Sequence, residues 1–200
     1  MLITVEGIDG AGKTTVVAGL ADALRARGRA VEALREPGGA ELSDRLRTLL
    51  SDPSLPVGGR AEALVYAAAR AQLVEELLRP LLERGMWVVL DRFVDSSLVY
   101  QGAARGLGVE AVRALNAFGT GGLTPDRTLL LRVDPATGLG RLTGRAAARD
   151  RIEREGEAFW DACVRAYDEL AAAEPERWAI IDATQPPEQV LAEALAHVEP

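Results

Sequence analysis

Residues 7–14 read GIDGAGKT and match the pattern G-x-x-x-x-G-K-[ST]. The short apolar run Leu2–Val5 precedes them, and a helical pattern, Thr14–Arg27, follows and stops at Gly28. A glycine-rich loop between a strand and a helix is the context in which this pattern binds a nucleotide polyphosphate. The stretch therefore predicts a phosphate-binding loop, called the P-loop below, within an α/β fold.

Lys13 is the only lysine among the 23 lysine and arginine residues of the chain. Its compact ammonium group fits among the loop amides beside the β- and γ-phosphates, whereas a planar guanidinium is too bulky. Thr14 is expected to bind Mg²⁺, and the N-terminus of the helix favours anions. The residues predicted to bind ATP are Gly7, Ile8, Asp9, Gly10, Ala11, Gly12, Lys13, Thr14 and Thr15.

The bulk properties of the 200-residue chain exclude several classes of protein. A net charge of −7 argues against binding nucleic acid or an anionic membrane. One cysteine excludes an intramolecular disulfide, and one histidine makes a Cys/His zinc site implausible. No apolar run approaches the roughly 20 residues of a membrane span, and we find no signal peptide. We therefore expect a cytoplasmic protein.

Strand-like apolar runs alternate with helical patterns along the chain, without repeats or linkers. The predicted strands are Leu2–Val5, Ala30–Leu34, Trp87–Leu90, Arg127–Val133 and Ala179–Ile181. The predicted helices are Thr14–Arg27, Leu42–Leu50, Arg60–Arg84, Ser96–Ala103, Val109–Ala117, Thr137–Ala147, Glu155–Ala173 and Pro187–His197. This alternation predicts one domain, residues 1–200, with a three-layer α/β fold and a parallel sheet. Ligands then gather at the carboxyl ends of the strands.

A second site is predicted where the third strand ends, in Asp91-Arg92-Phe93. Asp91 is suited to the metal shell, mainly through water, or to orienting an acceptor. Arg92 is suited to clamping a phosphate with two hydrogen bonds. The alternative interpretation is a helix-capping aspartate and a surface arginine.

Flanking helices carry further candidates for this second site. Tyr66 and Arg70 lie one helical turn apart, so an aromatic plane and a guanidinium share one face. This pair alone is more often core packing with a surface charge. The following helix carries Ser96, Ser97 and Tyr100, again at helical spacing, and Pro37 is a candidate cis proline that shapes a pocket.

The segment from about residue 141 to 154 is rich in arginine: Arg141, Arg145, Arg149, Arg151 and Arg154. The P-loop offers no arginine to the transferred phosphoryl group, and a guanidinium there is worth about 10³–10⁵ in rate. We therefore predict a mobile lid that delivers one, with Arg149 and Arg151 as the catalytic candidates. A solvated helix with local ion pairs is the alternative.

A P-loop leaves three classes of protein: a small-molecule kinase, a GTPase and an ATPase motor. The N-K-x-D motif of GTPases is impossible here, because the chain has no second lysine. A kinase needs an acceptor site, which the second group of residues supplies.

Taken together, these motifs resemble the bacterial thymidylate kinase family of nucleoside monophosphate kinases. The resemblance covers nearly the whole chain through VEGIDGAGKTT, REPGG, EALVYAAARAQLVEE, DRFVDSSLVYQGAARG, TPDRTLLLRVDP, DRIE and IDATQP. It implies a P-loop kinase fold with five parallel strands, a homodimer, Mg²⁺, and transfer of the γ-phosphoryl group of ATP to dTMP. Another nucleoside or nucleotide kinase of this fold, or an ATPase that binds a protein partner, is the alternative.

The resemblance also implies roles for single residues. Asp9 meets the 3′-hydroxyl side of the sugar, and Arg92 holds the acceptor phosphate. Tyr66 takes the place of an aromatic, usually phenylalanine, that stacks on thymine. The thymine is read by Arg70 at a carbonyl and by Ser97 at N3. Tyr100 takes the position that excludes a 2′-hydroxyl, and Phe93 stands where tyrosine or histidine is common and receives no role.

Overall fold

The structure is a computed structural model that describes residues 1–143 and 150–199, without the side chain of Thr143. Within these residues five parallel strands form one sheet in the order β2-β3-β1-β4-β5. The strands are β1 (Leu2–Glu6), β2 (Val31–Arg35), β3 (Trp87–Asp91), β4 (Arg127–Arg132) and β5 (Trp178–Asp182). The prediction of a parallel α/β fold is confirmed, and every predicted strand is present with shifted ends.

The central strand β1 is buried along its whole length, as expected for a parallel strand covered on both faces. It pairs with β3 so that Val5 lies beside Asp91. The chain segments that leave these two strands therefore start next to each other. This register places the P-loop beside Asp91 and Arg92 at the carboxyl edge of the sheet.

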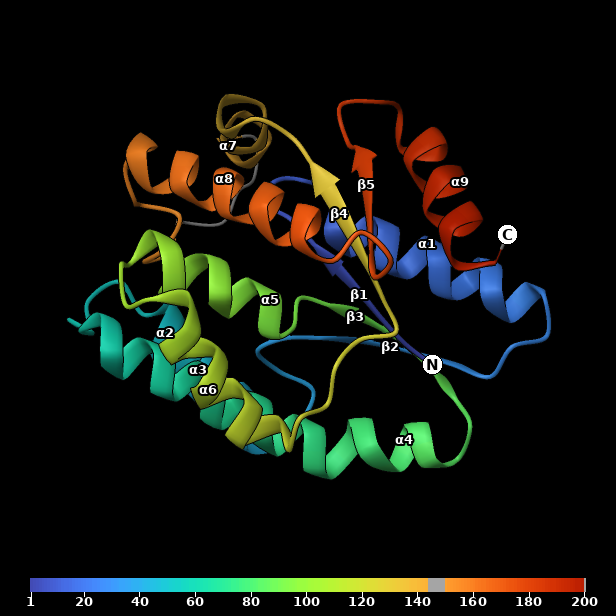
Figure 1. The fold of residues 1–200 in the computed structure, drawn as a ribbon, viewed down its shortest axis with the longest axis horizontal. Coiled ribbons are helices and arrows are strands. Elements are labelled where there is room, and N and C mark those ends of the chain that lie inside the picture. Colours follow the sequence, from blue (N-terminus) through green and yellow to red (C-terminus); the bar gives the residue numbers. More distant parts are fainter. Residues whose placement is uncertain (144–149, 200) are drawn as a thin grey trace.

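Helices cover both faces of the sheet (Figure 1). On one face α1 (Lys13–Ala26) packs against β1, β2 and β3, and α9 (Pro187–Val198) packs against α1 and β5. Val16, Val17, Leu20 and Leu24 of α1 are buried there. On the other face α4 (Arg79–Glu83) contacts β3, and α8 (Glu157–Ala173) contacts β4 and β5. The three layers confirm the predicted architecture.

Two of the predicted helices contain wider turns that the sequence pattern did not indicate. The segment predicted as one helix over Arg60–Arg84 is α3 (Gly59–Leu73), the π-helix η1 (Val74–Leu78) and α4. Pro80 lies just after this π-turn, and it lacks the N–H that an α-helix needs at each interior position. The predicted helix Ser96–Ala103 is α5 (Val94–Ser97) followed by the π-helix η2 (Leu98–Ala104).

The remaining helices lie around the carboxyl edge or beside α3. They are α2 (Glu41–Ser51), α6 (Val109–Thr120) and α7 (Pro135–Thr143). The predicted helix Thr137–Ala147 is confirmed as far as Thr143, and its last residues lie outside the described residues. Among the described helices, none is both long enough and apolar enough to span a membrane.

Candidate active site

The P-loop runs from the end of β1 into the first turn of α1. Gly10 and Gly12 have positive φ angles of 81° and 97°, which a side chain disfavours. A Cβ atom on Gly10 would lie 2.0 Å from the carbonyl oxygen of Gly138 in α7. The loop therefore needs glycine at position 10 both for its backbone and for its close approach to α7.

The ammonium group of Lys13 is folded back over the loop. Its Nζ donates hydrogen bonds to the carbonyl oxygens of Gly7, at 3.0 Å, and Ile8, at 2.8 Å. Burial lowers the pKa of Lys13 to about 8, with Arg92 acting in the same direction and Asp9 opposing it. The third N–H of the ammonium remains for a ligand. Lys13 thus sits where the P-loop motif requires its charge.

Other predicted ATP-binding residues contribute in different ways. Ile8 and Ala11 are buried, so these positions offer their backbones rather than their side chains. Thr14 and Thr15 are exposed in the first turn of α1. At this helix N-terminus the first backbone N–H groups have no partner within the helix, which favours an anion.

Thr14 and Asp91 come together across the carboxyl edge. The hydroxyl of Thr14 donates a hydrogen bond of 2.9 Å to Oδ2 of Asp91. A hydroxyl and a carboxylate are hard oxygen donors that suit Mg²⁺, which usually binds through one or two protein groups and the phosphates of its nucleotide. In the described part of the chain, no group of three or more His, Cys, Asp or Glu residues could hold a metal. The donor set therefore fits Mg²⁺ carried by a nucleotide.

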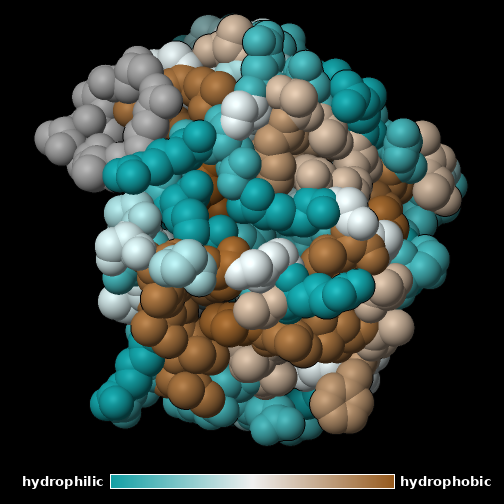
Figure 2. Space-filling model, turned by 90° about the vertical axis from the view of Figure 1, so that its left-hand side faces the viewer, coloured by the Kyte–Doolittle hydropathy of each residue, from teal (hydrophilic) through white to brown (hydrophobic). Residues whose placement is uncertain are grey.

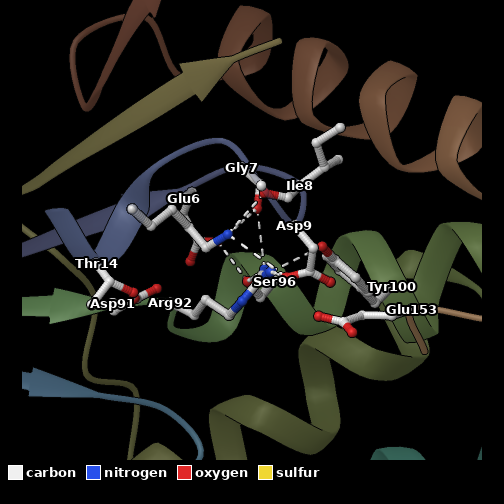
Figure 3. A network of polar contacts seen from close by, with 12 residues as sticks. Glu6, Gly7, Ile8, Asp9, Thr14, Asp91, Arg92, Ser96, Tyr100 and Glu153 are labelled. Atoms are coloured by element: carbon white, nitrogen blue, oxygen red, sulfur yellow. Dashed lines mark hydrogen bonds and ion pairs between the residues drawn. The ribbon is translucent and has the colours of Figure 1, made fainter. Parts of the chain in front are cut away.

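Arg92 follows β3 and points back to the P-loop (Figure 3). Its φ angle is 71°, the only positive φ of a non-glycine residue in the described part of the chain. Nη1 donates to the carbonyl of Gly7 at 3.2 Å and to Ser96 Oγ at 3.0 Å. Nη2 donates to Asp9 Oδ1 at 2.5 Å and to the Tyr100 hydroxyl at 3.1 Å. The guanidinium group thus links the P-loop to η2.

A pocket opens next to Arg92. All seven residues predicted to bind the acceptor line it: Asp9, Pro37, Tyr66, Arg70, Arg92, Ser97 and Tyr100. The Glu36–Pro37 peptide bond is cis, as proposed from the sequence. Tyr66 is a half-buried aromatic in the wall, and burial raises its pKa to about 12, so it stays neutral. The structure therefore brings the ends of β1, β2 and β3 together with α3, α5 and η2 around one pocket.

Arg70 is buried at the base of this pocket with an exposed fraction of 3 %. Nε donates to Glu36 Oε2 at 2.7 Å, and Nη2 donates to the carbonyl of Phe93 at 3.0 Å. Nη1 donates to Ser97 Oγ at 2.9 Å and to Asn116 Oδ1. These contacts use four of the five N–H donors of a guanidinium, so the orientation of Arg70 is set before any ligand binds.

Glu36 is the buried partner of Arg70 and was not singled out from the sequence. Its Oε1 atom is buried without a hydrogen-bond partner among the described residues. Burial raises the pKa of this carboxyl to about 7, and the opposing effect of Arg70 is smaller. Its position within REPGG was the signal that could have identified it.

The arginine-rich segment divides into residues with different positions. Arg141 in α7 donates to the carbonyl oxygens of Gly10, at 3.4 Å, and Ala183, at 2.9 Å. Arg151 forms an ion pair with Glu62 of α3, 2.5 Å from Nη1 to Oε2, and donates to the carbonyl of Leu50. The structure therefore does not bring Arg151 to the P-loop. The catalytic candidate Arg149, like Arg145, lies outside the described residues.

Several residues that line the pocket were missed by sequence reasoning. They are Glu36, Arg47, Leu50, Ser51, Gln101, Asp150 and Ile152. Asp150 and Ile152 belong to the DRIE motif within the predicted lid, so the motif marked them without indicating which site they reach. The α2 residues carried no such signal.

Comparisons with known proteins identify the family of this chain. The family model described as thymidylate kinase matches residues 5–194. The chain belongs to the thymidylate kinase family. It is 48 % identical to the thymidylate kinase of Deinococcus radiodurans, over 99 % of this chain and 96 % of the relative. It is 47 % identical to that of Desulfovibrio desulfuricans, over 100 % of this chain and 95 % of the relative.

A solved structure agrees with these sequence relatives. The crystal structure of thymidylate kinase from Ehrlichia chaffeensis matches with a TM-score of 0.83 at 27 % identity, covering 100 % of this chain and 98 % of that one. As a member of the thymidylate kinase family, the chain is a phosphotransferase with the P-loop kinase fold. The fold, the family and the enzyme class expected from the sequence are confirmed.

Proposed function

We propose that this enzyme transfers the γ-phosphoryl group of ATP to the phosphate of dTMP, giving ADP and dTDP. The observation that carries the proposal is the pocket beside the P-loop, which is lined by the guanidinium groups of both Arg92 and Arg70. A second nucleotide site next to a donor site is what a monophosphate kinase needs and an ATPase does not. Family membership also argues against the ATPase alternative.

On the donor side, Lys13 neutralises the β- and γ-phosphates, while the amides of the P-loop and the first turn of α1 hold the phosphate chain. Mg²⁺, when bound with ATP, would neutralise charge on the phosphate oxygens. We assign Thr14 and Asp91 to its shell, Asp91 mainly through water. The 2.9 Å hydrogen bond between the two groups supports this assignment because it brings two hard oxygen donors together at the first turn of α1.

On the acceptor side, Arg92 holds the phosphate of dTMP, and Asp9 meets the 3′-hydroxyl. Tyr66 stacks on the base beside Pro37, while Arg70 and Ser97 recognise its polar edge. The hydrogen bond of 2.9 Å from Arg70 to Ser97 supports a joint role, because it fixes both groups relative to each other. Tyr100 occupies the space where a ribose 2′-hydroxyl would lie, which favours deoxynucleotides.

A coupled assay of ADP release tests the proposal with a panel of nucleoside monophosphates. We expect turnover with dTMP. The kcat/KM for dCMP, dAMP and dGMP should be lower by about 100-fold or more, because a wrong base would leave buried polar groups of the site without hydrogen-bond partners. Arg92→Ala is the matched variant, which should lose acceptor use but keep ATP binding. Equal turnover of all monophosphates would contradict assignment of the pocket to thymine.

We also infer a homodimer. Large exposed apolar residues occur on neighbouring helices: Leu42 and Leu49 of α2, Leu64 of α3, and Phe118 of α6, which is 91 % exposed. Apolar side chains gather across the lower part of the face that Figure 2 shows, on the side where α2, α3 and α6 lie in Figure 1. Light scattering with Phe118→Glu tests this inference, with a shift toward monomer expected. A cytoplasmic location stays a prediction.

A further inference from the structure

Glu6, the last residue of β1, lies directly before the P-loop with its side chain fully buried. Its Oε1 accepts a hydrogen bond from the backbone N–H of Phe93 at 2.7 Å. Its Oε2 accepts hydrogen bonds from Ser96 Oγ at 2.6 Å and from the Tyr167 hydroxyl at 2.9 Å. None of the roles described so far uses this carboxylate.

The groups that Glu6 binds surround Arg92. Phe93 is the next residue, and Ser96 lies one turn further along in α5. The left-handed backbone of Arg92 is unfavourable for any residue with a Cβ atom, so neighbouring contacts must hold it. The N–H of Arg92 donates to Val5 at 3.1 Å, and the N–H of Phe93 donates to Glu6. The end of β1 thus holds both peptide groups of this strained residue.

Ser96 transmits the effect of Glu6 to the guanidinium. Because Ser96 donates its hydroxyl hydrogen to Glu6, the lone pairs of its oxygen remain for donors. Arg92 Nη1 donates to that oxygen at 3.0 Å. The hydroxyl oxygen of Tyr167, in α8, contacts both Ser96 and Glu6: it lies 3.1 Å from Ser96 Oγ and 2.9 Å from Glu6 Oε2. Figure 3 shows Glu6, Ser96 and Arg92 close together beside the P-loop.

We propose that Glu6 is a positioning residue which, with Tyr167, aims the Arg92 guanidinium at the phosphate of the acceptor nucleotide. It does so by holding the left-handed backbone of Arg92 and by orienting the Ser96 hydroxyl. This inference rests on the proposed role of Arg92 as the holder of the dTMP phosphate. A carboxylate is needed because both of its oxygens accept hydrogen bonds. In glutamine one oxygen is replaced by an NH₂ group, which is itself a donor. That group would face either the N–H of Phe93 or the hydroxyl groups of Ser96 and Tyr167, which also donate.

Binding of dTMP and of thymidine, measured by isothermal titration calorimetry without ATP, tests this role. The two ligands differ only in the phosphate that Arg92 would hold. The variants are Glu6→Gln and the milder Tyr167→Phe, which removes one hydroxyl. Thr4→Val is the matched control, since Thr4 is buried on the same strand and its hydroxyl contacts Thr128, away from the site.

We expect Glu6→Gln to raise the Kd for dTMP about 10-fold and Tyr167→Phe to raise it about 3-fold, consistent with weakened charge-assisted hydrogen bonds. Both variants should leave the Kd for thymidine within about 2-fold. Thr4→Val should lower the Tm without changing either Kd. In an Arg92→Ala background, Glu6→Gln should cause no further loss of dTMP affinity, because its effect passes through Arg92.

Unchanged dTMP affinity in Glu6→Gln and Tyr167→Phe would overturn the inference, as would an equal loss of affinity for both ligands. A wild-type protein that binds dTMP no better than thymidine would instead contradict the proposed role of Arg92, and the inference with it. The two failures are therefore distinguishable. Should Glu6→Gln not fold, Tyr167→Phe decides the outcome alone.

Discussion

The hydroxyl of Thr14 donates a 2.9 Å hydrogen bond to the carboxylate of Asp91, which joins the first turn of α1 to the end of β3. Both groups are hard oxygen donors, and the helix N-terminus between them attracts phosphate. This pair of side chains therefore connects the helix that follows the P-loop to the strand that ends just before Arg92.

From this pair we predict that Thr14→Val shifts the Mg²⁺ dependence of the reaction. The concentration of Mg²⁺ for half-maximal rate should rise several-fold, because one oxygen ligand of the metal is lost. A Mg²⁺ titration at saturating nucleotides measures it. Thr14→Ser retains the hydroxyl and should follow the wild-type curve. Identical curves for Thr14→Val and Thr14→Ser would remove Thr14 from the metal shell.

Lys13→Arg should lose almost as much activity as Lys13→Ala. We expect kcat to fall by about 100-fold or more, the effect of removing one hydrogen-bond donor to the transition state. The ammonium lies within hydrogen-bond distance of two loop carbonyls, at 3.0 Å and 2.8 Å, where a planar guanidinium does not fit. Steady-state kinetics and the Tm of both variants check this. Near-normal turnover of Lys13→Arg would show that charge alone matters.

Arg70→Ala should raise the KM for dTMP about 10-fold or more and leave the KM for ATP unchanged. It should also lower the Tm, because the buried carboxyl group of Glu36 would lose the ion pair and hydrogen bond that it makes with Arg70. The double variant Arg70→Ala/Glu36→Gln separates the two effects. It should recover part of the Tm but not the KM for dTMP. A change confined to ATP would mean that donor and acceptor sites are reversed.

The pKa of Glu36, raised from 4.5 to about 7 mainly by burial, predicts a pH dependence of stability. Between these values the folded protein binds more protons than the unfolded chain, so the free energy of unfolding falls as pH rises. Relative to Glu36→Gln, the wild-type protein should lose about 3 kcal/mol from pH 4.5 to pH 7. Urea denaturation of both proteins at several pH values measures this. A constant difference would contradict it.

Arg151→Ala and Arg149→Ala should have different effects. Arg151 pairs with buried Glu62, so its loss should lower the free energy of unfolding by about 1–3 kcal/mol with a small effect on kcat. Arg149→Ala should lower kcat by about 10³-fold with little change in either KM, if it serves the transition state. Denaturation and steady-state kinetics of both variants distinguish them. A pure kcat loss in Arg151→Ala would return that residue to the catalytic candidates.

The sequence by itself determined the features that depend on near neighbours. The GIDGAGKT motif, the apolar runs and the helical spacing located the P-loop, the strands and most helices, because hydrogen bonding and side-chain periodicity act over a few residues. The candidate acceptor residues could also be named, since helical spacing and the resemblance to a family both pointed to them. All seven line one pocket.

Only the tertiary structure decided which of these groups meet and what holds them. Arg92 reaches Asp9 across 83 positions of the chain, and Tyr167 reaches Glu6 across 161. Such contacts depend on strand order and on how helices pack, which local patterns do not encode. The same holds for Glu36 beneath Arg70, for Arg151 bound to Glu62, and for the π-turn that carries Tyr100. Each of these features depends on packing between elements that are distant in the sequence. For the buried charges the reason is energetic, because an unpaired buried charge is costly and the fold must supply it with a partner.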